Sequence, residues 1–414
     1  MEVRVLVAHN FYRQGGGEDV VVANERALLM DHGHEARLWS VSNDAIDGTW
    51  AKIKTAWQAP YSVTARKRMA QAIADFAPDI AHVHNFYPLL TPAIYDACQD
   101  AAIPLVQTLH NYRTICAAAI LMRSGHVCED CINGSPYQAV LHRCYRGSRL
   151  GSFAVARMID VHRKRRTWQT KVDRFIALTE FGKAKFVEAG FPESRIAVKP
   201  NFVEDRRIHG IDGGMSGALF VGRLSSEKGV ATFLRAWGSL DVPLRVVGDG
   251  PLLASVPAAA APAVTCLGRQ SAEVVAAEMA RAAFLVFPSV WYETFGLTIV
   301  EAFCQGLPVI ASRMGGMTEI VEDGVTGLHF KPGNSEDLAA KVRWAEAHPE
   351  EMRRMGANAR RAYEEKYTPE VNYRQLMAIY EQAMNSRQSM PADVECPQDV
   401  EERASRIEAT VLHP

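Results

Sequence analysis

The sequence lacks the features of a membrane-spanning, exported or strongly charged protein. No apolar run reaches the roughly 18 to 20 residues that a spanning helix needs. The first residues, Met1–Ala8, do not have the pattern of a signal peptide and are typical of a buried strand instead. Positive and negative side chains almost cancel, with 46 Lys and Arg against 47 Asp and Glu, and no nucleic-acid recognition motif is present. We therefore expect a cytoplasmic protein that does not bind nucleic acid.

Disulfide bonds are not expected either, because no export signal precedes the eight cysteines and a reducing compartment keeps them as thiols or metal ligands. The 414 residues, 48% hydrophobic and 22% charged, are enough for two domains with cores of their own. Their charge is uneven: the first 200 residues carry 25 Lys and Arg against 19 Asp and Glu, and the remainder carries 21 against 28. The amino-terminal half is therefore the positive half.

Strand and helix patterns alternate along both halves of the chain. Short apolar runs bounded by turn residues predict strands, and most are followed by helical or turn segments. Such alternation is typical of a parallel sheet covered on both faces. The predicted strands are Val3–Ala8, Glu35–Trp39, Ile80–His84, Leu105–Leu109 and Arg174–Leu178 in the first half, and Ala218–Val221, Leu244–Val247, Val264–Leu267, Phe284–Phe287 and Pro308–Ala311 in the second.

We predict an α/β protein with two doubly wound domains. Residues 1–205 form the first domain, the glycine-rich residues 206–217 a linker, and residues 218–368 the second domain. A last helix over residues 369–385 has apolar residues at helical spacing and is expected to strap the two domains together. Residues 386–414 are polar and rich in Glu and Arg, so we expect a disordered tail.

Glu293 and Glu301 flank a change from strand to helix. Pro288 stops the predicted strand, and Thr298–Gln305 has helical periodicity, so Glu293 falls on a loop and Glu301 on a helix. In an open parallel sheet, ligands bind at the loops after the strands, and the following helix offers free N–H groups to anions. One carboxylate could accept hydrogen bonds from a sugar and the other from a ribose. The amides at the helix start belong to Thr294, Phe295, Gly296 and Leu297.

Arg223 and Lys228 follow the first strand of the second half and could converge on one diphosphate. Arginine offers a planar fork and lysine a point charge, a pair suited to holding two negative charges and stabilising a leaving phosphate. Two solvated surface cations are the alternative. Gly222 precedes Arg223 and Gly248 follows the next strand, so each lies in a loop that can face a ligand.

In the first half, Gly15, Gly16 and Gly17 follow the first strand and open the first helix. Three glycines permit close approach of a ligand to the backbone, although the pattern is not the dinucleotide fingerprint. A flexible turn without a ligand is the alternative. His110 ends another predicted strand and faces the presumed cleft, where a purely structural histidine is the alternative.

Taken together and in order, these motifs resemble the retaining glycosyltransferases of family 4. The resemblance covers about residues 1–385 and rests on an ordered set rather than on a single motif. In the second half it includes Gly222-Arg223-Leu224, Glu227-Lys228-Gly229, Gly248–Pro251, Pro288–Ala302, Gly306–Ser312, Gly315-Gly316, Glu319 and Asp323–Gly327, and in the first half the glycine loop, His110 and Pro200-Asn201.

The resemblance implies a GT-B fold, in which two Rossmann-like domains face each other across a cleft. The second domain would hold the nucleotide sugar and the first the acceptor. Catalytic roles fall to His110, Arg223, Lys228 and Glu293. Donor contacts fall to Gly16, Gly17, Gly222, Arg223, Lys228, Gly248, Thr294, Phe295, Gly296, Leu297 and Glu301. Within this set, Arg223 and Lys228 would take the diphosphate, Glu301 the ribose, Glu293 the donor sugar and His110 the reacting centre.

Such enzymes transfer a sugar with retention of configuration and need no divalent cation. Consistently, no Asp-x-Asp stands at the end of a predicted strand. We expect a hexose to pass from a UDP- or GDP-sugar to a polysaccharide, a lipid-linked oligosaccharide or a glycolipid. A GT-B sugar-nucleotide epimerase and a catalytically silent nucleotide-sugar-binding scaffold are the alternatives. The chain departs from the family at the hinge, where Phe202 stands in place of a common glycine.

A second departure is an insertion-like segment over about residues 111–147. It contains four of the eight cysteines, Cys116, Cys128, Cys131 and Cys144. Cys128 and Cys131 have the spacing of structural zinc sites, and the other two could complete a tetrahedral set, with His126 and His142 as substitutes. An iron–sulfur cluster and free or redox-linked thiols are the alternatives. Four thiolates leave no open position, so a zinc site here would be structural.

Two basic clusters interleaved with aromatic residues lie in the positive half. One surrounds Trp168 within residues 157–171, and the other combines Trp50, Trp57 and Tyr61 with basic residues of 52–68. These clusters could contact anionic lipid at the inner face of a membrane. Ordinary solvated helix faces are the alternative.

Overall fold

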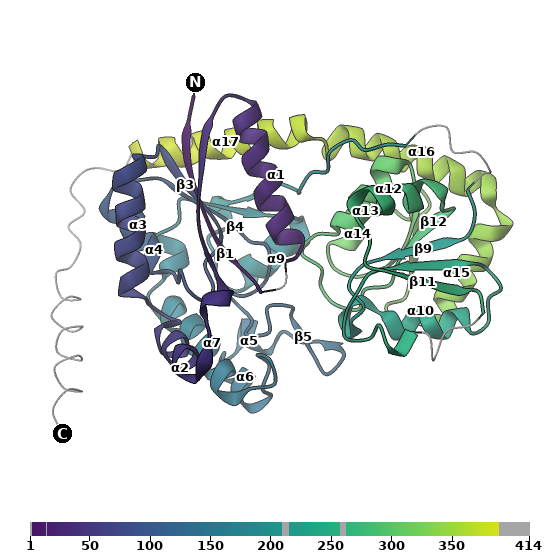
Figure 1. The fold of residues 1–414 in the computed structure, drawn as a ribbon, viewed down its shortest axis with the longest axis horizontal. Helices are drawn as coiled ribbons and strands as arrows, with labels where there is room; N and C mark the ends of the chain where they lie inside the picture. Colours follow the sequence, from purple (N-terminus) through teal and green to yellow (C-terminus); the bar gives the residue numbers. More distant parts are fainter. Residues whose placement is uncertain (1, 14, 209–214, 257–261, 389–414) are drawn as a thin grey trace.

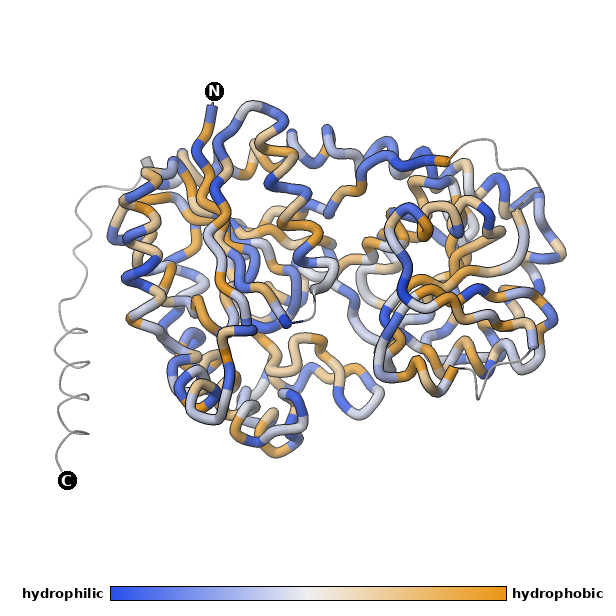
Figure 2. Tube along the Cα trace, in the orientation of Figure 1, coloured by the Kyte–Doolittle hydropathy of each residue, from blue (hydrophilic) through white to orange (hydrophobic). Residues whose placement is uncertain are grey.

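The computed structural model describes residues 2–13, 15–208, 215–256 and 262–388. They form two lobes that lie side by side, each built on a six-stranded parallel sheet with helices on both faces (Figure 1). Strands are largely apolar and lie inside each lobe, whereas polar residues concentrate on the outer turns of the helices (Figure 2). The predicted α/β architecture with two doubly wound sheets is therefore confirmed.

The amino-terminal sheet has the strand order β2-β1-β3-β4-β7-β8. Its strands are β1 Arg4–Phe11, β2 Glu35–Ser42, β3 Ile80–Asn85, β4 Leu105–Thr108, β7 Arg174–Ala177 and β8 Ile196–Val198. The helices of this lobe are α1 Gly17–Asp31, α2 Gly48–Gln58, α3 Val63–Phe76, α4 Ala93–Asp100, α7 Arg149–Lys164, α8 Thr167–Thr170 and α9 Glu180–Glu188, with short 3₁₀ turns at Asn43–Ala45 and Glu193–Arg195.

The carboxyl-terminal sheet has the order β11-β10-β9-β12-β13-β14. Its strands are β9 Ala218–Val221, β10 Leu244–Val247, β11 Val264–Gly268, β12 Phe284–Phe287, β13 Val309–Ser312 and β14 Gly327–Phe330. The helices are α10 Val230–Trp237, α12 Ala272–Arg281, α13 Leu297–Gln305, α14 Met317–Ile320, α15 Ser335–Ala347 and α16 Pro349–Lys366, with a 3₁₀ turn at Ser226–Lys228.

Strand order reverses once in each sheet, between β1 and β3 and between β9 and β12. Connections leave a doubly wound sheet in opposite directions at such a point, so the loops there splay apart and leave a crevice for ligands. The glycine loop follows β1, and the loops carrying Lys228 and Glu293 follow β9 and β12. The fold therefore places both sequence-predicted loop groups at the crevice of their sheet.

The last helix, α17, spans Pro369–Gln388 and returns from the second lobe to the first (Figure 1). Leu376, Ile379 and Tyr380 pack with Val5 and Ile80 in the core beneath the amino-terminal sheet. The helix expected over residues 369–385 runs to Gln388 in the structure. The rest of the tail expected over residues 386–414 lies outside the described residues, as do residues 209–214 of the expected linker.

Two edge strands, β8 and β14, were not among the strands predicted from the sequence. They are three and four residues long and their apolar runs are correspondingly short. Their place at the edge of each sheet lets such short segments pair on one side only.

Candidate active site

The loops after β9 and β12 are pinned against each other. Gly229 has a φ of 72°, and a Cβ there would lie 1.9 Å from the carbonyl oxygen of Pro288. Val290 N also donates to the carbonyl of Glu227 at 2.9 Å. Only glycine allows this approach, since any side chain would overlap the facing backbone. The contact holds Lys228 beside the loop of Glu293.

Lys228 and Glu293 form an ion pair, with Nζ 2.5 Å from Oε1. The hydroxyl of Ser289 donates to the same carboxylate oxygen at 2.7 Å, and Glu293 is only 4% exposed. The ammonium also lies 5.5 Å from the ring centroid of Trp291. The structure thus brings two of the predicted site residues into direct contact, with the Glu293 carboxylate buried and the Lys228 ammonium partly exposed.

Arg223 is exposed on the loop that leaves β9, five residues before Lys228. The loop that carries Arg223 packs closely against the loop after β10. A Cβ on Gly248 would lie 1.9 Å from the carbonyl oxygen of Gly222. Gly222 and Gly248 thus have a packing role in the structure, and their donor contact stays a prediction. Lys228 is therefore paired with Glu293, whereas the Arg223 side chain is exposed to solvent.

Helix α13 begins just after Glu293 and directs its first turn at the same crevice. Its N-cap is Gly296, which has no side chain to accept hydrogen bonds from the free amides of the first turn. Phe295 is buried, which anchors the turn that carries these amides. Glu301 lies one turn into the helix, where burial raises its pKa to about 7 against the lowering effect of Arg206. This geometry is compatible with an anion bound at the first amides of α13 and with a ligand hydroxyl that donates to Glu301.

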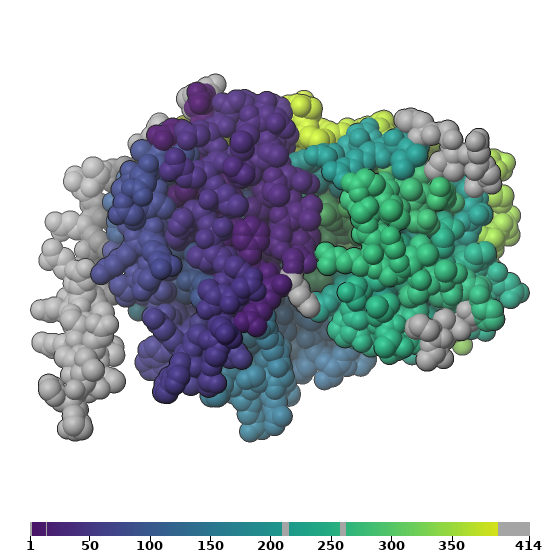
Figure 3. Space-filling view, in the orientation of Figure 1, coloured from purple at the N-terminus to yellow at the C-terminus, as the bar shows by residue number. Residues whose placement is uncertain are grey.

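His110 lies across the cleft in the amino-terminal lobe and is bonded to the loop of Glu293. Thr294 Oγ1 donates to the carbonyl of His110 at 2.7 Å, which joins the two lobes directly at the site. The imidazole is 9% exposed, and burial lowers its pKa to about 3. It is therefore neutral at physiological pH. Figure 3 shows the recess between the two lobes.

A buried polar chain that the sequence did not predict stands behind His110. His84 Nδ1 lies 2.9 Å from His110 Nε2, and His84 Nε2 lies 3.5 Å from Glu25 Oε1. Glu25 Oε2 in turn accepts from Lys199 Nζ at 2.9 Å, and Lys199 donates to Asn372 Oδ1 at 3.0 Å. The chain thus runs from the predicted catalytic histidine through α1 and the end of β8 to α17.

One proton is shared in the contact between the two imidazoles. The nearby Glu25 carboxylate favours a proton on His84 Nε2, and in that tautomer His84 Nδ1 accepts from His110 Nε2. Burial would raise the pKa of Glu25, but Lys199 and the neighbouring histidines outweigh it and lower that pKa. Glu25, His82 and His84 bring ligand atoms within 4.8 Å of one another. Because the Lys199 ammonium already neutralises Glu25, we interpret this group as an ion-pair network and not as a metal site.

The glycine loop lies at the start of α1 among carboxylates. Gly16 N donates to Asp19 Oδ2 at 3.0 Å, so this amide is already bonded. A Cβ on Gly16 or Gly17 would meet nothing within 4 Å, so neither glycine is required by local packing. Glu18 accepts from Asn111 Nδ2 at 3.3 Å, and burial raises its pKa to about 8. A donor contact at Gly16 and Gly17 stays a prediction.

Two further contacts join the lobes, and they use residues from the family motifs. The Glu319 carboxylate accepts from the backbone N of Glu180 at 2.8 Å and of Phe181 at 2.5 Å, which caps the start of α9. A Cβ on Gly316 would lie 2.8 Å from the side chain of Thr179. Glu319 and Gly316 therefore hold the two lobes in register in this structure.

The hinge accommodates its unusual residue. Phe202 is buried and does not adopt a left-handed backbone conformation, so no glycine is needed at this position. Asn372 Nδ2 donates to the carbonyl of Pro200 at 2.7 Å, and the hydroxyl of Tyr363 donates to the carbonyl of Val203 at 2.9 Å. Helices α16 and α17 thereby fix the path between the lobes.

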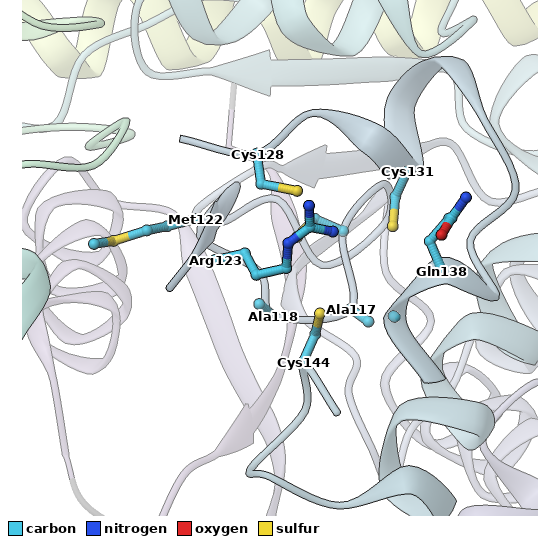
Figure 4. A pocket seen from close by; sticks show the side chains of 10 residues that line it. Ala117, Ala118, Met122, Arg123, Cys128, Cys131, Gln138 and Cys144 are labelled. Atoms are coloured by element: carbon cyan, nitrogen blue, oxygen red, sulfur yellow. The ribbon is translucent and has the colours of Figure 1, made fainter. Parts of the chain in front are cut away.

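The four clustered cysteines line one small cavity in the segment between β4 and α7 (Figure 4). Burial and the three neighbouring thiols raise the pKa of Cys131 to about 12. His126 and His142 are exposed and do not line this cavity. The structure thus brings the cysteines together and leaves the two substitute histidines outside.

Two Rossmann-like lobes that meet at a cleft define a GT-B protein, and solved structures bear this out. Anabaena HepE in complex with UDP-glucose matches with a TM-score of 0.66 and 17% identity, over 94% of this chain and 100% of that one. The sucrose-phosphate synthase of Thermosynechococcus elongatus matches with a TM-score of 0.69 and 16% identity, over 93% and 100%. The predicted GT-B fold is confirmed.

The family follows from the sequence matches. The model for Glycosyltransferase Family 4 matches residues 15–207, and the model for Glycosyl transferases group 1 matches residues 201–362. The chain belongs to glycosyltransferase family 4. An uncharacterised glycosyltransferase of Methanocaldococcus jannaschii is 30% identical over 217 residues, which are 51% of this chain and 60% of that protein, less than two thirds of its length. The alpha-D-kanosaminyltransferase of Streptomyces kanamyceticus is 26% identical over 80% of this chain and 83% of its own length.

Proposed function

We propose that the protein transfers a hexose, with retention of configuration, from a UDP- or GDP-sugar to a glycan or lipid-linked acceptor. The observation that carries this proposal is the ion pair of Lys228 with Glu293, whose loop is bonded through Thr294 to His110 on the opposite lobe. Family membership and the GT-B fold support the reaction class. Complexes of Anabaena HepE with UDP and with UDP-glucose support a nucleotide-sugar donor.

The carboxyl-terminal lobe would bind the donor. The diphosphate lies against Arg223, Lys228 and the free amides of α13, where positive charge and N–H groups converge. Lys228 turns from Glu293 to phosphate, and the Glu293 carboxylate then accepts hydrogen bonds from the sugar hydroxyls. Glu301 accepts from the ribose. The loop after β9 carries Arg223 and Lys228, and the loop and helix after β12 carry Glu293 and Glu301.

Retention follows from attack on the face from which the phosphate leaves. The acceptor hydroxyl oxygen forms the new bond to the anomeric carbon while the bond to the diphosphate oxygen breaks, and the departing phosphate takes the hydroxyl proton. His110 is neutral and bonded to His84, so it is placed to orient the sugar near the reacting carbon and not to act as a charged base. Arg223 and Lys228 supply the positive charge for the leaving group, so no divalent cation is required.

Product analysis separates this proposal from the alternatives. With a nucleotide sugar and an acceptor extract, a transferase forms a glycosylated product whose anomeric configuration, read by nuclear magnetic resonance, matches that of the donor. An epimerase converts the donor without an acceptor. A silent scaffold binds the donor and leaves it unchanged, and either of these two outcomes would overturn the proposed reaction.

We also propose that the acceptor is presented at a membrane surface. On α2, Trp50 and Trp57 are 84% and 73% exposed and share one helix face with the exposed Ile53. Helix α7 packs against α2 and adds the exposed Leu150 and Phe153. Exposed tryptophans on a face with nearby lysines are typical of helices that lie in the interface of an anionic membrane.

One part of the expected interfacial surface was wrong. Trp168 is only 3% exposed and packs against Phe191 in the core, so it is not available to lipid. None of the helices in the described part of the chain is long and apolar enough to cross a membrane. The proposed contact is therefore a surface contact through α2 and α7.

A further inference from the structure

The segment between β4 and α7 has little regular structure of its own. Its elements are the two-residue strands β5 Met122–Arg123 and β6 His126–Val127 and the four-residue helices α5 Asp130–Asn133 and α6 Gln138–Leu141. Nine non-glycine residues in the described chain have a positive φ, and five of them lie here: Ala119, Leu121, Ser124, Arg143 and Arg146. Left-handed backbone at such residues persists only where other interactions hold it. The short strands and helices therefore do not by themselves account for the conformation of this segment.

Four thiols converge within this segment from separate points along the chain. Cys116 N closes a turn on Tyr112 O at 2.7 Å, and Cys128 N donates to Leu121 O at 2.8 Å beside the β5–β6 hairpin. Cys131 lies in α5, and Cys144 follows α6. All four line one cavity of about 10 Å³ (Figure 4). This volume holds a single ion or water and excludes an organic ligand.

We propose that Cys116, Cys128, Cys131 and Cys144 bind one zinc ion that cross-links this segment. On binding, the four thiols lose their protons and become the four ligands of a tetrahedral site, which leaves no position open for catalysis. Zinc–sulfur bonds are about 2.3 Å long, so the sulfurs must move inward. At present no three of the four, all within the described chain, lie within 4.8 Å of one another. Rotation of the cysteine side chains toward the cavity that they share would have to supply this movement.

The surroundings suit the charge of such a site. A zinc ion with four thiolates carries a net charge of −2, and Arg123, which also pairs with Asp130 at 2.7 Å, lines the same cavity (Figure 4). Arg163 also donates to the carbonyls of Cys131 and Gly134, at 2.8 and 2.9 Å, which ties the cysteine turn to α7. These cations would offset the negative charge that zinc binding brings into the segment.

The position of the segment gives the ion a structural role at the cleft. Asn111 and Tyr112 immediately follow His110, and Tyr112 stacks on Phe186 of α9 at a centroid distance of 5.5 Å. Glu129, between the two central cysteines, pairs with Lys185 of α9 at 2.7 Å. A metal that fixes residues 116–144 therefore also fixes the chain that leaves His110. The inference rests on the cysteines alone and does not depend on the proposed reaction.

Metal content and metal spectroscopy on the full chain test the proposal. Protein purified under reducing conditions without added chelator should contain about one zinc per chain by elemental analysis. Exchange for Co²⁺ should give the visible absorption of a tetrahedral cobalt–thiolate site. Cys131→Ser should lose most of the metal and the cobalt spectrum. Cys266→Ser removes a cysteine that lies outside the cluster and should keep both.

Other outcomes overturn the proposal. Folded wild-type protein that carries no zinc and takes up no Co²⁺ would exclude the site. Visible absorption and iron in the purified protein would identify an iron–sulfur cluster instead. A mass two or four units below that of the reduced chain would show disulfides among these cysteines. If Cys131→Ser does not fold, zinc content and the cobalt spectrum are measured on Cys128→Ser instead, which alters a less buried cysteine of the same site.

Discussion

Lys228 Nζ and Glu293 Oε1 lie 2.5 Å apart, on two loops that leave neighbouring strands at the point where the strand order of the carboxyl-terminal sheet reverses. Without a donor, each group neutralises the other. A diphosphate is a stronger partner for the ammonium than one carboxylate, so donor binding would draw Lys228 away and free Glu293 for sugar hydroxyls. In the proposed mechanism, donor charge and donor sugar would thus be recognised by one exchange of partners.

The raised pKa of Glu301 predicts that donor affinity depends on pH. In the proposed donor site the carboxylate would accept ribose hydrogen bonds in its ionised form, and burial raises its pKa to about 7. Affinity for an intact nucleotide sugar, whose diphosphate does not titrate in this range, should therefore weaken about tenfold between pH 8 and pH 6. Glu301→Gln should bind with no such slope. Titration calorimetry across this pH range is the measurement, and a flat wild-type profile would remove Glu301 from the ribose site.

His84 is predicted to be a positioning residue for His110. It fixes the His110 ring through the 2.9 Å contact and determines which nitrogen carries the proton. His84→Ala should lower kcat by up to about a hundredfold, the scale for misplacing a group at the reacting centre, with KM for the donor little changed. The nitrogen chemical shifts of His110 should also report a changed tautomer.

A matched control for this variant is His348→Ala, which alters an exposed histidine at the start of α16. It should leave kcat and the His110 spectrum unchanged. Equal loss of kcat in both variants, or an unchanged His110 tautomer in His84→Ala, would contradict the positioning role.

The buried pair of Glu25 and Lys199 should matter for stability. Both side chains are at most 3% exposed, so removing one leaves a buried charge without its partner. Lys199→Met should lower the free energy of unfolding by about 3–5 kcal/mol, measured by denaturant titration. The double variant Glu25→Leu with Lys199→Met removes both charges and should recover much of this loss.

Lys164→Ala is the control for the buried pair, because it breaks the exposed ion pair with Asp160 and should not change stability measurably. A loss in the double variant that equals the sum of the single losses would show that the two charges do not interact. In that case the chain from His110 to α17 would not be a connected network.

Exposed aromatic residues on α2 predict binding to anionic vesicles. Trp50→Ser with Trp57→Ser removes the two most exposed rings and should abolish co-sedimentation with vesicles of anionic phospholipid, while donor binding in solution stays the same. Trp344→Ser alters a partly exposed tryptophan on α15 in the other lobe and should bind vesicles like wild type. Unchanged binding by the double variant would exclude α2 as the contact.

The sequence predicted most of the fold because its strands are short apolar runs punctuated by glycine and proline. The exceptions, β8 and β14, have little pattern of their own and depend on a neighbouring strand. At the site, the sequence predicted Lys228, Glu293 and Glu301 as functional residues, and the structure joins the first two in an ion pair. Glu293 and Glu301 were found from their spacing along the unit of β12 and α13, and Lys228 from its place after β9.

The network behind His110 could not be predicted in the same way. Glu25, His84 and Lys199 come from α1, β3 and the end of β8, and no local motif links them. A lysine and a glutamate in otherwise apolar surroundings were the only signal, and such residues are usually exposed. Only the packing of α1 and α17 against the sheet brings them together.

Donor binding and turnover of Lys228→Ala, in buffer without added divalent cation, test the central claim most directly. Wild-type protein should bind one UDP- or GDP-hexose saturably without divalent cation. Lys228→Ala should fold normally and lose at least about a hundredfold in turnover, the scale for deleting a positioned charge at a leaving group. Lys366→Ala, at an exposed position on α16, should match wild type. No binding of any nucleotide sugar by folded wild-type protein in this buffer, or wild-type turnover in Lys228→Ala, would contradict the account.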